Sequence, residues 1–134
     1  MPIAIHALRL PPGADLRRSL SMLPAEQGFE AGFILSAVGS LSHARLRLAG
    51  AETIWEFEAD VELLTLAGTL GTDGAHLHMS VADANGEVTG GHVLEGCVVR
   101  TTMEIVVGIA PDWQFRREPD AATGFSELRA ERQG

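Results

Sequence analysis

The fold is decided by residues 68–107, GTLGTDGAHLHMSVADANGEVTGGHVLEGCVVRTTMEIVV, which also hold three of the five histidines of the chain. Residues 76–81 alternate between polar and apolar side chains, and this alternation is typical of a β-strand with one buried face. The apolar residues of the strand are expected to face a core. His76 and His78 then project side by side from the opposite face, so the same stretch raises the question of function.

Two further features of residues 68–107 extend this pattern. Gly90-Gly91 predicts a tight bend that leads into His92. Residues 97–107 alternate again, which predicts a second strand. If the two strands share one sheet, Arg100 and Glu104 lie on the same face as the histidines.

The rest of the chain predicts one principal helix near the N-terminus and a series of strands. Asp15 can cap a helix in which leucines recur at helical spacing, Pro24 predicts a kink or a restart, and Gly28 predicts the end. Asn85-Gly86 is a strong signal for a hairpin after the histidine strand. The predicted strands are residues 3–10, 29–42, 44–48, 53–60, 63–70, 76–81, 97–107 and 113–115. Alternation within two of these strands predicts that Leu64 and Thr101 point inward.

These elements predict an α+β fold that is mainly antiparallel β-sheet. With 134 residues and a hydrophobic share of 46%, the chain can bury one substantial core, so residues 1–134 are expected to form a single domain. The longest charge-free apolar stretch, residues 31–44, is too short to span a bilayer, and we expect a soluble cytoplasmic protein. The single cysteine, Cys97, is expected to be a buried thiol rather than a nucleophile.

The charge of the chain argues against binding to nucleic acid. The net charge is −8, and all ten basic residues are arginine. Binding to phosphate backbones requires a basic surface, whereas residues 48–115 contain many acidic residues and a single arginine, Arg100. Arg17-Arg18 and Arg116-Arg117 are interpreted as the polar faces of a helix and a strand.

His76, His78 and His92 are the candidate metal ligands. Neutral imidazole is a good ligand near pH 7, an i, i+2 pair on a strand puts two ligands on one side, and a loop histidine can complete the triangle. Zinc suits three such ligands with an open fourth position, and nickel, copper and iron are the alternatives. The competing interpretation is a set of surface histidines hydrogen-bonded to their neighbours. The residues alone support both interpretations.

Three further residues are candidates around such a site. Asp83 or Glu104 could orient a ligating imidazole or join the metal. Arg100 could pair with either carboxylate in a purely structural role, or it could bind the anionic part of a small ligand near the metal. Because no Ser-His-Asp order, phosphate-binding loop or dinucleotide motif occurs, no reaction is assigned.

The chain resembles the PPC domain family, which occurs in bacteria, archaea and plant AT-hook nuclear proteins. Four segments carry the resemblance and cover nearly the whole chain: GFEAGFILSAVGSLSHARLRLAG (28–50), GTLGTDGAHLHMSVADANGEVTGGHV (68–93), GCVVRTTMEIVV (96–107) and FRREPDAATGFSEL (115–128). The resemblance implies an α+β domain that assembles as a homotrimer, with a cluster of three histidines that can hold a metal ion. It therefore favours the metal interpretation of His76, His78 and His92.

The resemblance leaves several functions open. The first is a metal-binding domain with ligand binding or catalysis at the open metal position. The second is a non-enzymatic module for oligomerisation and protein interaction, which is the role of the domain in the plant relatives. DNA-associated regulation is a third, but the Arg-Gly-Arg-Pro tract of AT-hooks is absent from this sequence. The cupins also have a His-x-His after a glycine-rich turn, but their following glutamate and Pro-x-Gly motif are missing here.

Residues 29–42 add a physical reason to expect self-association. They are nearly all apolar or small, which is typical of a strand buried on both faces. A threefold arrangement would cover such surface and protect strand edges from open-ended addition. We therefore expect a homotrimer whose histidine sites lie at or near the subunit boundaries.

Overall fold

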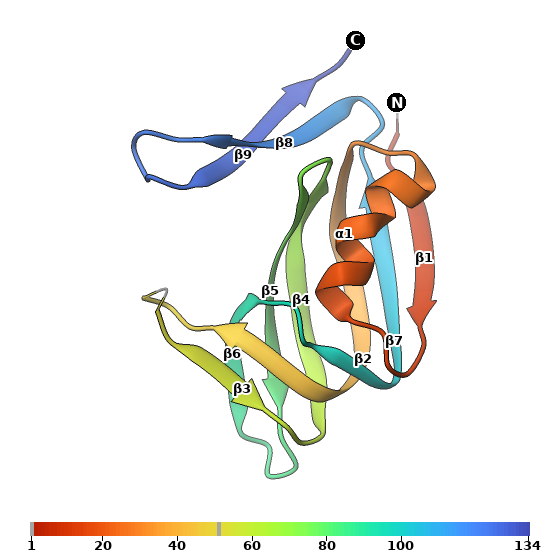
Figure 1. The fold of residues 1–134 in the computed structure, drawn as a ribbon. Helices are drawn as coiled ribbons and strands as arrows, with labels where there is room; N and C mark the ends of the chain where they lie inside the picture. Colours follow the sequence, from red (N-terminus) through yellow and green to blue (C-terminus); the bar gives the residue numbers. More distant parts are fainter. Residues whose placement is uncertain (1, 51) are drawn as a thin grey trace.

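One helix packs against a curved antiparallel sheet, and a separate hairpin lies across one end of that sheet (Figure 1). The computed structural model describes residues 2–50 and 52–134. The elements, in chain order, are β1 (Ala4–Leu10), α1 (Leu16–Gln27), β2 (Ala31–Arg47), β3 (Ile54–Phe57), β4 (Val61–Gly71), β5 (Gly74–Ala82), β6 (Val88–Val93), β7 (Val98–Ile109), β8 (Trp113–Pro119) and β9 (Ser126–Arg132). The predicted α+β fold, mainly antiparallel sheet with one N-terminal helix, is confirmed.

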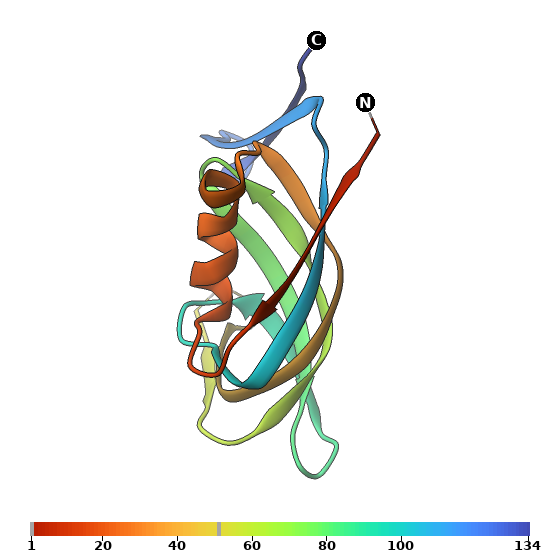
Figure 2. The ribbon, with the colours of Figure 1, turned by 90° about the vertical axis from the view of Figure 1, so that its right-hand side faces the viewer.

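The long strand β2 organises the sheet. The strand order is β1-β7-β2-β4-β5-β6, and β3 pairs with β2 outside this path. The C-terminal end of β2 also pairs with β6, through Leu46 with Val93 and Arg47 with His92. Strands β2, β4, β5 and β6 therefore close on themselves, and the sheet curves around its core with the helix on one side (Figure 2).

The helix begins and ends close to where the sequence predicts. The Asp15 carboxylate accepts the backbone N–H of Arg18 and caps the first turn, while Gly28 ends the helix in the left-handed conformation with a φ of 71°. Pro24 lies inside the last turn of one continuous helix, so of the predicted kink or restart, the restart does not occur. The helix closes normally because the carbonyl of Pro24 accepts the N–H groups of Gly28 and Phe29.

The core lies between the helix and the concave side of the sheet. Leu16, Leu20 and Leu23 cover one face of α1 and are almost completely buried, and each contributes about 1.5–3 kcal/mol by leaving water. Strand β5 supplies the facing apolar side chains by strict alternation, as predicted: Leu77, Met79 and Val81.

Irregular pairing explains where the predicted side-chain faces are wrong. Leu64 was expected to point inward, but a register shift between Leu63 and Thr65 leaves it 48% exposed. Thr101, also expected to point inward, is exposed on β7, where the pairing with β2 slips between Gly39 and Leu41.

Strand β2 also departs from the sequence-based expectation. Residues 29–42 and 44–48 were predicted as two strands, the first buried on both faces, yet residues 31–47 form one bulged strand. Leu35 is 49% exposed and Val38 is 58% exposed, so one face of this strand is uncovered in the single chain.

The C-terminal segment forms more structure than the sequence indicated. The expected short strand around residues 113–115 extends to Pro119 as β8 and pairs with β9, which was not predicted. The hairpin is held to the end of the sheet by backbone hydrogen bonds of Phe115 with Glu30 and Thr72. Among the residues that the structure describes, no helix has the length and apolar character needed to cross a membrane.

Candidate metal centre

Strand β5 places His76 and His78 on the exposed face of the sheet. Because side chains alternate along a strand, the burial of Leu77 and Met79 turns both imidazoles outward. The two ring centroids are 5.1 Å apart, and the rings meet edge to face. The predicted side-by-side projection of the pair is confirmed.

His92 joins the pair through strand β6. His78 and His92 are direct partners in the antiparallel register, and the centroid of the His92 ring lies 5.6 Å from that of His78 and 5.3 Å from that of His76. The expected bend at Gly90-Gly91 is wrong, because both glycines are strand residues and His92 is not in a loop. A Cβ at Gly91 would lie 2.8 Å from the carbonyl oxygen of Arg47, so this glycine lets β6 approach β2.

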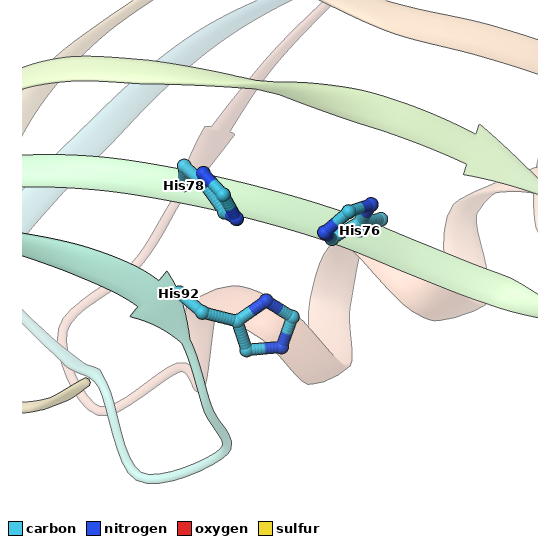
Figure 3. Close-up of side chains that lie close together, drawn as sticks. All are labelled: His76, His78 and His92. Carbon is cyan, nitrogen blue, oxygen red and sulfur yellow. The ribbon is translucent and has the colours of Figure 1, made fainter. Parts of the chain in front are cut away.

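The three rings present nitrogen atoms to a common space. One ligand nitrogen from each histidine lies within 4.8 Å of the others. Tetrahedral zinc, with Zn–N distances of about 2.0–2.1 Å, requires its nitrogen ligands to be about 3.3 Å apart, so the rings need to close by about 1.5 Å at most. In Figure 3 the nitrogen of His92 that is adjacent to its side-chain attachment, Nδ1, is turned toward His76 and His78. This Nδ1 is buried and has no hydrogen-bond partner within the described part of the chain. An unpartnered buried nitrogen at the centre of the cluster fits a metal ion.

The other nitrogen of His92 is in contact with an arginine. Nη1 of Arg17 lies 3.1 Å from Nε2 of His92 and donates to the carbonyl oxygen of Val93 at 2.7 Å. A guanidinium can only donate, so Nε2 accepts and the neutral ring carries its proton on Nδ1. The single lone pair of His92 is therefore used by Arg17 in this structure.

Electrostatics favour neutral imidazoles in the cluster. Burial lowers the pKa of His92 from 6.5 to about 4, and the positive charges of Arg47 and Arg17 contribute to the shift. Burial also lowers the pKa of His76, with the charge of Arg117 as the next cause. Both rings are neutral near pH 7, which is the form that binds metal ions.

A cavity of about 530 Å³ opens beside the histidines. It lies between the first turn of α1, the end of β2, the start of β5 and the tip of the β8–β9 hairpin. Its lining includes both His76 and His92 together with Arg17, Arg47 and Arg117. This grouping is not evident in the sequence, because Arg17 and Arg117 fit ordinary polar positions on a helix and a strand and only the tertiary fold brings the three arginines together.

The other predicted site residues lie elsewhere. Asp83 caps the β5–β6 turn by accepting the N–H groups of Asn85 and Glu87. Arg100 forms an ion pair with Asp60 at 3.3 Å, not with Asp83 or Glu104. Arg100 and Glu104 belong to β7, which β2 and β4 separate from β5. The structure does not bring these three residues to the histidine cluster.

A second group with ligand-type side chains lies on β2 and the region of β3. His43, Glu56 and Glu58 offer atoms within 4.8 Å of one another. Nε2 of His43 is already 2.8 Å from Oε1 of Glu56, and both carboxylates are exposed. This group is explained as a surface hydrogen bond and provides an internal comparison for the three histidines.

Fold and site together define a class of protein: an α+β domain with a curved antiparallel sheet that carries three clustered imidazoles on its exposed face. The sequence pattern of the Plants and Prokaryotes Conserved (PCC) domain matches residues 2–111, and the chain belongs to this family. The resemblance to the PPC family that the sequence suggested is confirmed.

Individual relatives agree with this assignment. The chain is 49% identical over 126 residues to the bifunctional protein GlmU of a Synechococcus strain; the match covers 94% of the chain but only 20% of that protein. A hypothetical protein from Salmonella enterica has the same fold, with a TM-score of 0.93 and 37% identity over 98% of this chain and 95% of that one. A metal-containing protein from Archaeoglobus fulgidus is similar with a TM-score of 0.80 and 26% identity, over 94% of this chain and 93% of that one.

Proposed function

We propose that the protein binds a divalent transition metal ion on His76, His78 and His92, and that zinc is the ion that suits the site best. The observation that carries the proposal is the buried, unpartnered Nδ1 of His92, which is turned toward the other two rings. An N–H left without a partner in a buried place costs about 1–3 kcal/mol, and a bound ion removes that cost once the ring proton has moved to Nε2 and the lone pair lies on Nδ1. The metal-containing relative from Archaeoglobus supports the proposal.

Three protein ligands leave the fourth position of a tetrahedral ion open. Zinc in such a position acts as a Lewis acid or lowers the pKa of a bound water, and it can instead hold a small ligand. The neutral state of His76 and His92 near pH 7 means that little proton release opposes binding. Nickel, copper and iron accept the same nitrogen ligands, so a competition titration among these ions decides the identity of the metal.

Metal content and thermal stability test this proposal. The protein is purified without a histidine tag, and bound metal and the unfolding temperature with added zinc are measured for the wild type, His78→Ala and His6→Ala. His6 lies on β1, outside both groups of ligand-type residues, and serves as the matched control. We expect one metal ion per chain and a rise in unfolding temperature for the wild type and His6→Ala, and neither for His78→Ala. A wild type that holds no stoichiometric metal and gains no stability from zinc contradicts the proposal.

We also propose that the protein assembles as a homotrimer with the histidine sites at or near the subunit boundaries. Support comes from large apolar side chains that are exposed on β1, β2 and β4 and lie outside the core: Ile5, Leu35, Val38 and Leu64. An uncovered apolar face of this kind favours self-association. Light scattering at micromolar concentration is expected to give three times the chain mass of 14.3 kDa. A monomer mass contradicts the trimer.

The same exposed face supports an alternative function, in which the domain is a non-enzymatic module for oligomerisation and protein interaction. That function predicts that His76, His78 and His92 can be replaced together while assembly persists. Loss of a measurable ligand-binding or catalytic activity in the same triple variant favours the metal function instead.

A further inference from the structure

The arginine side chains of the cavity are concentrated in an otherwise acidic protein. Three of the ten basic residues of a chain with a net charge of −8 line one space: Arg17 from α1, Arg47 from β2 and Arg117 from β8. None of the three guanidinium groups forms an ion pair with a carboxylate of residues 2–50 or 52–134. The side chain of Arg47 has no hydrogen bond to the described residues either. Unpaired positive charge gathered in one cavity favours an anionic ligand.

The carboxylates of the cavity do not cancel this charge. Asp73 and Glu127 also line it, but Oδ2 of Asp73 already accepts the backbone N–H of Arg117 at 2.8 Å. Three guanidinium groups against two carboxylates leave an excess of one positive charge.

Phe125 gives the cavity an apolar rim. This side chain comes from the hairpin connection between β8 and β9, lines the cavity, and is 68% exposed. An exposed aromatic ring beside convergent charged donors is the usual composition of a site for a small organic molecule with one charged group. The cavity volume of about 530 Å³ lies in the range of such sites.

We propose that this cavity binds a small phosphate monoester, with the phosphate on Arg17, Arg47 and Arg117 and the organic part against Phe125. The proposal deepens the proposed function and rests on it, because His76 and His92, two of the proposed metal ligands, line the same cavity. A phosphate fits better than a carboxylate since the guanidinium groups come from three different elements. The three terminal oxygens of a phosphate point in different directions, whereas a carboxylate offers two oxygens in one plane.

Arg17 couples the two sites through His92. The neutral imidazole has one lone pair, and Arg17 uses it at Nε2. A metal ion on either nitrogen of His92 takes that lone pair, so Arg17 must give up this hydrogen bond. The hydrogen that Nη1 donated to Nε2 then becomes available to the phosphate, while the hydrogen bond to the carbonyl of Val93 can persist. Metal binding and phosphate binding are therefore expected to strengthen each other.

The first experiment measures the affinities of several classes of ligand by calorimetry at low ionic strength. The probes are phenyl phosphate, inorganic phosphate, benzoate and phenol, each titrated into zinc-loaded protein and into protein stripped with a chelator. We expect phenyl phosphate to bind most tightly, inorganic phosphate next, and benzoate at least about tenfold more weakly than phenyl phosphate. Benzoate that binds as tightly as phenyl phosphate overturns the assignment to phosphate esters.

The second experiment tests the residues with matched pairs of variants. Arg47→Met is compared with Arg45→Met, two residues earlier on the same strand and outside the cavity. We expect the affinity for phenyl phosphate to fall at least about tenfold in the first and by less than about twofold in the second. Arg47→Gln repeats the test if Arg47→Met unfolds. If the wild type and a folded Arg47 variant bind phenyl phosphate with equal affinity, the proposed phosphate site is wrong.

Replacing Arg17 is expected to change the affinity for phenyl phosphate and the affinity for zinc in opposite directions. In Arg17→Met the affinity for phenyl phosphate is expected to fall while the affinity for zinc rises several-fold, because a competing donor and a nearby positive charge are both removed. Arg18→Met, at the exposed neighbouring position, is expected to change neither. A loss of both affinities in Arg17→Met indicates a merely structural role and overturns the coupling. Wild-type protein that binds phenyl phosphate but does not take up added zinc would instead support the cavity and contradict the metal site.

Discussion

Cys97 illustrates how burial removes the reactivity of a side chain. Its Sγ is fully buried, accepts the backbone N–H of Arg45 and donates to the carbonyl oxygen of the same residue, both at 3.3 Å. Burial raises the pKa of the thiol from 9.0 to about 11. The reactive thiolate is therefore suppressed in the folded protein.

This pKa shift predicts a pH dependence of the free energy of unfolding. The unfolded thiol loses its proton near pH 9, whereas the folded thiol keeps it until about pH 11, so in this window the unfolded state binds fewer protons. Stability is then lost as the pH rises, by about 2–3 kcal/mol for the full shift. Denaturant unfolding of wild type and Cys97→Ala across this window measures the effect. Parallel stability curves for the two proteins would contradict the prediction.

The histidines show how far single residues could be predicted. The facing of His76 and His78 follows from alternation alone, since Leu77 between them must be buried. His92 was correctly proposed as their neighbour, but its position on a strand was not predicted. A Gly-Gly pair is a signal both for turns and for the close approach of two strands. The contact of His92 with Arg17 spans 75 residues, and no local pattern indicates it.

Strand β6 is the element on which the histidine cluster depends most. It inserts between β5 and β2, where Gly91 passes so close to Arg47 that no side chain fits without a shift of backbone. Periodicity along the sequence could not reveal this insertion. The six residues of β6 do not alternate in hydrophobicity, and their pairing with β2 is long-range.

Gly91→Ala is expected to displace β6 and with it His92. The added Cβ would meet the carbonyl oxygen of Arg47 at 2.8 Å, and forcing such a contact typically costs about 1–3 kcal/mol. Gly90→Ala, where the nearest atom is at 3.2 Å, is expected to cost less. Chemical denaturation and zinc titration of both variants measure the two effects. Gly91→Ala protein with wild-type stability and zinc affinity would contradict this account of the strand.

β-Bulges explain most of the remaining differences between the predicted and the observed strands. Register shifts occur in the pairing of β2 with β7 and of β4 with β5, and each one changes which residues face the core. A prediction that extends strict alternation through such a point reverses the faces beyond it. Leu64 is an example, since it is exposed where alternation placed it inside.

At the scale of the whole molecule, the closed arrangement of β2, β4, β5 and β6 leaves one face of the sheet uncovered. The helix covers one side of the sheet (Figure 2). Large apolar side chains outside the core, such as Ile5 and Val38, remain in contact with solvent. The general class of the fold could be predicted because most strands alternate clearly. The closure itself could not, since it depends on two residue pairs between the end of β2 and the end of β6.

Val38→Glu is expected to convert the proposed trimer to monomers. Val38 is 58% exposed and pairs with Glu104 in the register, so a new carboxylate there adds both desolvation and like-charge repulsion to any interface. Ile54→Glu, on the short strand β3, is the control and is expected to stay assembled. Sedimentation velocity compares the masses. Identical masses for wild type and Val38→Glu would show that this face is not the interface.

The most direct test of the metal site is anomalous diffraction from crystals grown with zinc, recorded on both sides of the zinc absorption edge. With zinc on the three histidines, we expect one strong anomalous peak per chain within about 2.0–2.1 Å of a nitrogen of His76, His78 and His92. We also expect that Arg17 has moved away from Nε2 of His92. A peak at His43, Glu56 and Glu58 with none at the three histidines, or no peak at all, would contradict the central claim.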